Sequence, residues 1–266
     1  MHEGEAYAHA ELFLSTLALT QPRILAMCLM LPMFNRQVLP GMLRYAIAAA
    51  IGLVLVPALA PEYASLDLHA IDLVLIVMKE VFIGLAMGLL VAIPFWVFEA
   101  VGFVVDNQRG ASMGAILNPA TGNDSSPLGI LFNQAFMVFF LISGGFSLML
   151  TVLYDSFQLW SLWHWVPTLR IESTPLILDQ FSRLMRMTLL WAAPAVIAMF
   201  LAELGLALAS RFTPQLQVFF LAMPIKSALS LLVLALYMST LFEYANEAND
   251  GLTAILPFFN NQWWAP

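Results

Sequence analysis

The feature that most constrains this chain is a run of 30 residues, 125–154, that contains no Asp, Glu, Lys or Arg. At a rise of 1.5 Å per residue a helix of this length extends about 45 Å, which exceeds the roughly 30 Å hydrocarbon core of a bilayer. Gly144 and Gly145 divide the run, and we expect a kink or a hairpin there. The run predicts a chain that is embedded in a membrane or assembled there.

Charge is scarce along the whole chain. Of 266 residues, 10 are Lys or Arg and 17 are Asp or Glu, whereas soluble domains average about 25% charged residues. This excludes a soluble globular enzyme. A net charge of -7 argues against nucleic acid as a partner, and the single Cys28 excludes an intrachain disulfide and a cysteine metal cluster. We expect no metal and no cofactor, and the acidic N-terminus predicts no cleaved presequence.

Other apolar segments predict the remaining helices of the first half. Residues 12–35 are interrupted at 21–23, so one helix and two short pieces are equally open. Residues 45–61 and 81–98 each predict a helix. Within the latter, Gly84 and Gly88 have the spacing that lets two helix backbones approach closely.

The second half is divided by Pro and charged residues. Residues 187–202, 212–225 and 227–242 predict three segments that are each short for a lipid-facing span. We expect them to pack against protein, which can supply partners to interrupted backbone. No strand-type alternation occurs, so the chain is predicted to be all-α and a single domain over residues 1–266.

Polar residues recur at helical spacing after the third apolar segment. Glu99, Gly102, Asp106 and Arg109 are separated by 3, 4 and 3 positions, so they share one helix face. Asp106 and Arg109 can pair along the helix. A channel wall or a polar subunit interface would use such a stripe, and an ordinary structural contact is equally open. The candidate stripe comprises Glu99, Asp106, Gln108, Arg109 and Gly110.

A loop rich in Asn, Pro, Gly and Ser follows, over residues 115–127. Apolar residues at its start would be disfavoured in a fully solvated loop, so we expect them to be packed or to occlude a passage. An ordinary surface turn is the alternative. The candidate residues are Met113, Ile116, Leu117, Asn118 and Pro119.

Five ionisable residues lie within or beside apolar segments, where an unpaired charge costs at least about 2.5 kcal/mol. They are Lys79, Glu80, Glu203, Arg211 and Lys226. Salt bridges within or between subunits are one explanation, and a proton or ion relay is the other. No Ser/His/Asp constellation, phosphate-binding glycine loop or metal-ligand spacing accompanies them, so we predict no catalytic residue.

Two motifs resemble a known family. They are D-N-Q-R-G-A-S-M-G at 106–114 with N-P at 118–119, and P-A-V-I-A-M-F-L-A-E-L-G-L-A-L-A-S-R-F-T-P-Q-L-Q-V-F-F-L-A-M-P-I-K-S at 194–227. Both closely resemble the T subunit of the type III secretion export apparatus, whose flagellar counterpart is the FliR family. The resemblance covers roughly residues 12–245 and is stronger to the virulence-associated branch.

The resemblance implies a non-enzymatic subunit of an export gate in the bacterial inner membrane, assembled with R and S subunits and contacting the U subunit. Unfolded secretion substrates would pass through its centre. The fold implied is one of broken helical hairpins, with an R-like portion at about 1–186 and an S-like portion at 187–266. By the same resemblance, the loop around Ile116 corresponds to a plug across the closed pore. A secondary transporter or another helical channel component is the alternative function.

Overall fold

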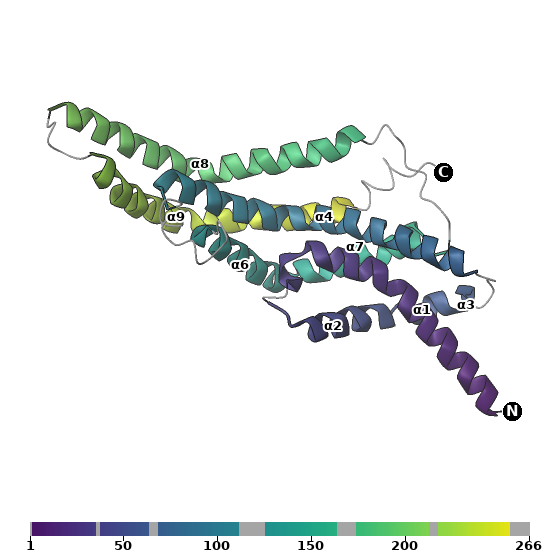
Figure 1. Cartoon of the computed structure of the whole chain (residues 1–266). Helices are drawn as coiled ribbons and strands as arrows, with labels where there is room; N and C mark the ends of the chain where they lie inside the picture. Colours follow the sequence, from purple (N-terminus) through teal and green to yellow (C-terminus); the bar gives the residue numbers. More distant parts are fainter. Residues whose placement is uncertain are drawn as a thin grey trace. The chain divides into compact units, whose positions relative to one another are not determined.

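The chain is all-helical throughout the part that the computed structural model describes, residues 2–35, 38–63, 69–111, 126–163, 174–212 and 218–255 (Figure 1). The main helices are α1 (His2–Met30), α2 (Gly41–Leu53), α3 (Val56–Tyr63), α4 (Ala70–Arg109), α6 (Pro127–Ile142), α7 (Gly145–Leu159), α8 (Thr174–Phe212) and α9 (Val218–Asp250). Short 3-10 turns are η1 (Pro32–Phe34) and η4 (Gly251–Ala254).

The chain divides into two compact units. The first contains residues 1–92, 144–175 and 250–266, and the second contains residues 93–143 and 176–249. The helix α4 contributes to both, because the division falls within it. These units have other boundaries than the R-like portion (1–186) and the S-like portion (187–266). The division into R-like and S-like portions stays a prediction.

In the first unit, α1 is one continuous helix despite Pro22 in its interior. The side chains of Thr20 and Gln21 donate to the Leu17 carbonyl oxygen at 2.7 and 3.3 Å, in the turn before the proline. Pro22 itself removes the backbone donor to the Ala18 carbonyl oxygen, a loss that membrane helices tolerate where neighbouring groups or local adjustments compensate. Of the two alternatives for this segment, the single helix is confirmed.

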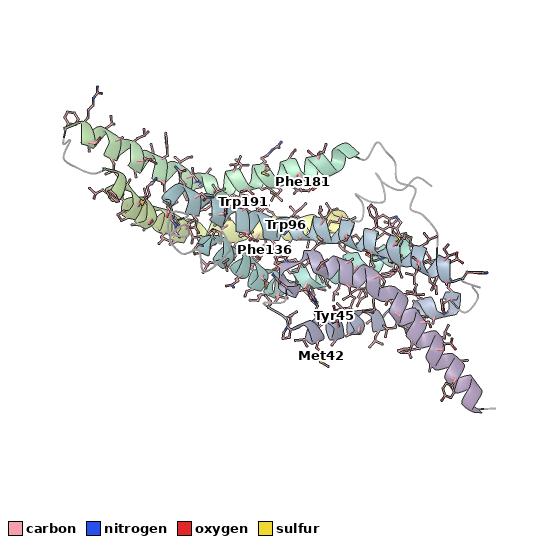
Figure 2. The ribbon with its side chains drawn as sticks, in the orientation of Figure 1. Met42, Tyr45, Trp96, Phe136, Phe181 and Trp191 are labelled. Atoms are coloured by element: carbon pink, nitrogen blue, oxygen red, sulfur yellow. The ribbon has the colours of Figure 1, made fainter. Side chains whose placement is uncertain are left out.

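The segment predicted as one helix at 45–61 is two helices, so that prediction was wrong. α2 ends at Leu53, α3 begins at Val56, and the two are bent by 69°. Pro57 accounts for the break, because its missing N–H is tolerated in the first turn of a new helix and not in a helix interior. Figure 2 labels Met42 and Tyr45 on α2, which are 89% and 56% exposed.

The backbones of α1 and α4 pack closely at Gly84 and Gly88, as the spacing of these two glycines predicted. A Cβ atom at Gly84 would overlap the Arg23 carbonyl group, and one at Gly88 would lie 2.8 Å from the Met27 carbonyl oxygen. Only a hydrogen fits at either place. The break expected at Gly144 is also confirmed, since its φ of 84° ends α6 and precedes α7.

The three short segments predicted in the second half are two long helices, and that prediction was wrong. α8 has 39 residues with Pro194 inside, and α9 has 33 residues with Pro224 inside. Charged residues such as Glu203 mark no helix end, because helix propensity is high for Glu, Lys and Arg. Pro214 lies outside the described residues.

Aromatic side chains form much of the core of the second unit. Phe136 of α6, labelled in Figure 2, packs edge-on against Phe95 of α4 at 4.7 Å between ring centroids and stacks on Phe98 at 4.6 Å. Trp191 of α8 stacks on Tyr244 of α9 at 5.5 Å, and it also contacts Phe98 at 5.3 Å. These rings join α4, α6, α8 and α9.

Within the described residues, four helices are long and apolar enough to cross a membrane, and six candidate spans result if each of two bent pairs counts as one. The four are Tyr7–Met30, Ala70–Arg109, Leu178–Phe212 and Phe220–Asn249. The expected all-α membrane fold is therefore confirmed.

Candidate functional site

A buried ion pair lies at the centre of the first unit. Arg23 of α1 and Glu80 of α4 are both 0% exposed, and the guanidinium donates to both carboxylate oxygens, from Nε at 2.6 Å and from Nη2 at 2.9 Å. The remaining donors of Arg23 reach the Ser156 hydroxyl at 3.1 Å and the Trp160 carbonyl oxygen at 2.9 Å. The Phe157 ring centroid lies 4.0 Å from the guanidinium carbon. Arg23 thus links α1, α4 and the C-terminal end of α7.

Lys79 extends the same cluster. Its Nζ lies 3.1 Å from a Glu80 carboxylate oxygen and donates to the carbonyl oxygens of Ser161 and Leu162 at 3.0 and 2.8 Å. Two cations therefore share one carboxylate in an apolar environment. Such a cluster is stable only while every member is present, because removing one partner leaves a buried charge uncompensated.

The candidate polar stripe faces α6 along much of its length. Asp106 is 3% exposed, and its carboxylate accepts from the Ser126 hydroxyl at 2.6 Å and from the Leu128 amide at 2.9 Å. Arg109 pairs with Asp106 at 2.7 Å, as expected from their spacing. Ser126 also accepts from the Gly129 amide at 2.8 Å and is the N-cap of α6. Asp106 therefore fixes the start of the next helix.

Other residues of the polar stripe also contact α6. Glu99 accepts from the Asn133 side chain at 2.6 Å, and a Cβ atom at Gly102 would overlap the backbone at Gly129. Gln108 is partly buried, and Gly110 has a φ of 85°, a conformation that favours glycine at the end of a helix. Glu99, Asp106 and Arg109 thus each have a partner within the chain, and a role in a channel wall or a subunit interface stays a prediction.

The charged residues of the α8–α9 pair are more exposed. Lys226 pairs with Glu203 at 3.1 Å, with side chains 12% and 49% exposed. Arg211 is exposed near the end of α8, and no ion pair joins it to another residue in the described ranges. The structure brings Glu203 and Lys226 together, and it leaves Arg211 apart from them.

The remaining candidates lie beyond what the structure describes. Met113, Ile116, Leu117, Asn118 and Pro119 all fall in the undescribed range 112–125. Across the described ranges, no group of three or more His, Cys, Asp or Glu residues could hold a metal ion.

Sequence reasoning missed Arg23, Ser156 and Trp160 as parts of the buried cluster. A signal for Arg23 was present, because it is a charged residue in the middle of an apolar segment and Glu80 needed a cation of opposite charge. The interruption at residues 21–23 does not by itself indicate which helix supplies the partner of Arg23.

The spans and the buried ion pair define a multi-pass helical membrane protein. The chain belongs to the family described as bacterial export proteins, family 1, whose model matches residues 14–252. It is 40% identical over 249 residues to Yop proteins translocation protein T of Yersinia pestis, covering 92% of this chain and 95% of the relative.

Two further relatives place the chain within the family. Surface presentation of antigens protein SpaR of Salmonella typhimurium is 33% identical over 225 residues, which are 84% of this chain and 82% of the relative. Flagellar biosynthetic protein FliR of Bacillus subtilis is 28% identical over 222 residues, which are 83% of this chain and 85% of the relative. The resemblance to the T subunit family is confirmed, with higher identity to these virulence-associated relatives than to this flagellar one.

Proposed function

We propose that this chain is the T-type subunit of the export gate of a type III protein secretion system in the bacterial inner membrane. There it assembles with R- and S-type subunits, contacts the U subunit and lines a passage for unfolded secretion substrates. Its role is structural and gating, with no catalytic step.

The full-length match to Yop proteins translocation protein T carries the proposal, since it covers 95% of that relative. The exposed apolar surface of α8 and α9 supports assembly. Only 17% of the most apolar window of each helix is buried, which leaves room for lipid or for partner helices.

For the charged residues we propose ion pairing in place of a proton relay. Glu203 and Lys226 already pair, which supports this role, and Arg211 then supplies a cation for a neighbouring subunit. Arg211→Ala should lower the yield of assembled complex together with secretion. Full assembly with selectively abolished, proton-motive-force-dependent export would favour the relay.

For the loop at 113–119 we propose a plug across the closed passage. Met113, Ile116 and Leu117 supply flexible apolar bulk, and Met adapts its shape to an irregular constriction. Deleting residues 115–120 should leave the complex assembled and increase the leak of small solutes across the membrane. Unchanged membrane tightness in the assembled mutant would remove this role.

Co-expression tests the proposal as a whole. Without R- and S-type partners the chain should be degraded or aggregated, and with them it should purify as one complex of defined stoichiometry. A stable, monodisperse monomer that binds a small solute would instead indicate a transporter.

A further inference from the structure

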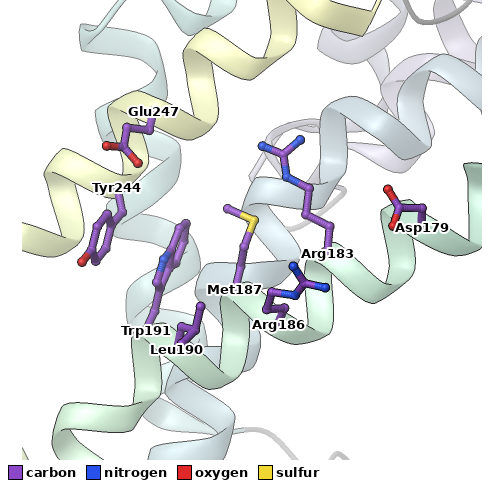
Figure 3. Close-up of a pocket in the computed structure, with 8 residues that line it drawn as sticks. All are labelled: Asp179, Arg183, Arg186, Met187, Leu190, Trp191, Tyr244 and Glu247. Carbon is purple, nitrogen blue, oxygen red and sulfur yellow. The ribbon is translucent and has the colours of Figure 1, made fainter.

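A cavity of about 540 Å³ lies in the second unit between the N-terminal part of α8 and the C-terminal part of α9 (Figure 3). Its volume falls in the range of about 300–1,000 Å³ that is typical of sites for small ligands. The cavity is lined by Asp179, Arg183, Arg186, Met187, Leu190, Trp191, Tyr244 and Glu247. No residue described above as part of a polar cluster contributes to it.

The charged groups of this cavity carry both signs. Asp179, Arg183 and Arg186 share one face of α8, because they are separated by 4 and 3 positions. Glu247 comes from α9, and Figure 3 shows Arg183 extending into the space between the two helices. Among the described residues, none of these four side chains is joined to another by an ion pair or a hydrogen bond. Two cationic and two anionic groups are therefore available to a ligand.

The two ends of the cavity differ in polarity along α8. The charged residues lie toward the start of the helix, and Leu190 and the stacked Trp191–Tyr244 pair lie further along it. Beyond them, α8 continues without charge to Ala202 and exposes large apolar side chains, among them Ile197 and Leu201 at 58% and 61%. Trp and Tyr are the residues enriched at the boundary between headgroups and acyl chains. The cavity thus lies where a polar region passes into an apolar one.

We propose that this cavity binds the headgroup of a zwitterionic aminophospholipid. Arg183 and Arg186 hold the phosphate, since guanidinium groups form strong, charge-assisted hydrogen bonds to phosphate oxygens. Glu247 holds the ammonium group next to the Trp191–Tyr244 pair, whose rings stack on each other and form an aromatic wall of the cavity. The acyl chains then lie along the exposed apolar side of α8. A purely anionic headgroup fits less well, because it would leave the Glu247 carboxylate without a partner.

Lipid titration of the purified complex tests this proposal. The full chain, in the assembly in which it purifies, is titrated in detergent with short-chain phosphatidylethanolamine or phosphatidylglycerol, and bound lipid is counted by native mass spectrometry. Phosphatidylethanolamine should bind more tightly than phosphatidylglycerol. Arg183→Gln with Arg186→Gln should weaken both lipids by at least about tenfold, because both present a phosphate.

A variant of the Glu247 carboxylate distinguishes binding of a zwitterionic headgroup from binding of an anionic one. Glu247→Gln should weaken phosphatidylethanolamine several-fold and leave phosphatidylglycerol unchanged or slightly stronger. Glu243→Gln is the matched control, since Glu243 lies one turn earlier on α9, is exposed and does not line the cavity. It should change neither affinity. If the double arginine variant fails to assemble, the Glu247→Gln comparison alone decides.

Three results would overturn the proposal. They are tighter binding of phosphatidylglycerol, equal effects of Glu247→Gln on the two lipids, and a photocrosslinking residue at position 190 that captures a partner subunit in place of lipid.

Discussion

The helix pairs α1–α4 and α8–α9 differ in how far their charged side chains are buried. In α1 and α4, 44% and 56% of the most apolar window is buried within the chain, and the Arg23–Glu80 pair has no exposure. In α8 and α9 the corresponding share is 17% for each helix, and the Glu203 side chain is 49% exposed. In α1 and α4 the ion pair is buried by the chain itself. In α8 and α9 the Glu203–Lys226 pair also forms within the chain, but it is left partly exposed to the surroundings.

This difference indicates which helices depend on partners. Buried ion pairs hold helices in one arrangement, because alternatives leave a charge uncompensated. Exposed pairs contribute roughly 0–1 kcal/mol and hold little. We infer that the first unit folds to a defined structure on its own sequence, and that the α8–α9 pair reaches its final stability only when lipid or other subunits cover it.

Replacing the buried carboxylate should have the largest effect. Glu80→Gln leaves Arg23 and Lys79 facing each other without a counter-charge, so we expect a loss of about 3–5 kcal/mol in the free energy of unfolding. Unfolding of the chain within the purified complex in mixed micelles, titrated with denaturing detergent, measures this loss. Glu203→Gln is the matched control in the other helix pair and should cost less than about 1 kcal/mol. Equal losses would contradict the comparison.

Adding a single methyl group should have an intermediate effect that depends on the region. Gly84→Ala places a Cβ against the Arg23 carbonyl, and we expect a loss of about 1–3 kcal/mol because α1 and α4 must separate. Gly205→Ala in α8 meets nothing within 4 Å and should be neutral or stabilise by up to about 1 kcal/mol, since Ala favours the helix. The same unfolding titration compares them. A destabilising Gly205→Ala would show that this face of α8 is covered.

The smallest expected effect is the salt dependence of the stability lost in Lys226→Gln. Lys226→Gln removes the partly exposed pair, and its cost in the purified complex should fall from a few tenths of a kcal/mol to nothing as the salt concentration rises from about 0.05 to 0.5 M, because salt screens exposed charges. The cost of Glu80→Gln should persist over the same range. A salt-independent effect of Lys226→Gln would place that pair in a buried environment.

Local chemistry was readable in the sequence. The Gly84 and Gly88 spacing predicted close backbone packing, Gly144 predicted a break, and the spacing of Asp106 and Arg109 predicted their pairing. Asp106 and Arg109 are three positions apart, so their contact is local in the sequence. At the glycines the missing side chain allows a close approach of two backbones or a positive φ. The polar stripe was found, and its contact with α6 was left open because helix periodicity gives a face and not the neighbour of that face.

Long-range features were less readable. The predicted segments are shorter than α8 and α9, because charged residues and prolines suggest helix boundaries in a sequence, whereas the two helices continue through Glu203, Lys226, Pro194 and Pro224. The partner of Glu80 is 57 positions away at Arg23, and only the packing of α1 on α4 brings the two together. Hydropathy carries no information on such a pairing.

The distance in sequence between Arg23 and Glu80 has a consequence for how the chain enters the membrane. Glu80 follows Arg23 by 57 positions, so at a synthesis rate of about 5–20 residues per second it appears roughly 3–11 seconds later. During that interval α1 carries a charge that costs about 2.5–3.5 kcal/mol at the centre of a lone membrane helix. Pairing with Glu80 offsets this cost, so the contact favours insertion of α1 and α4 into the bilayer as a pair.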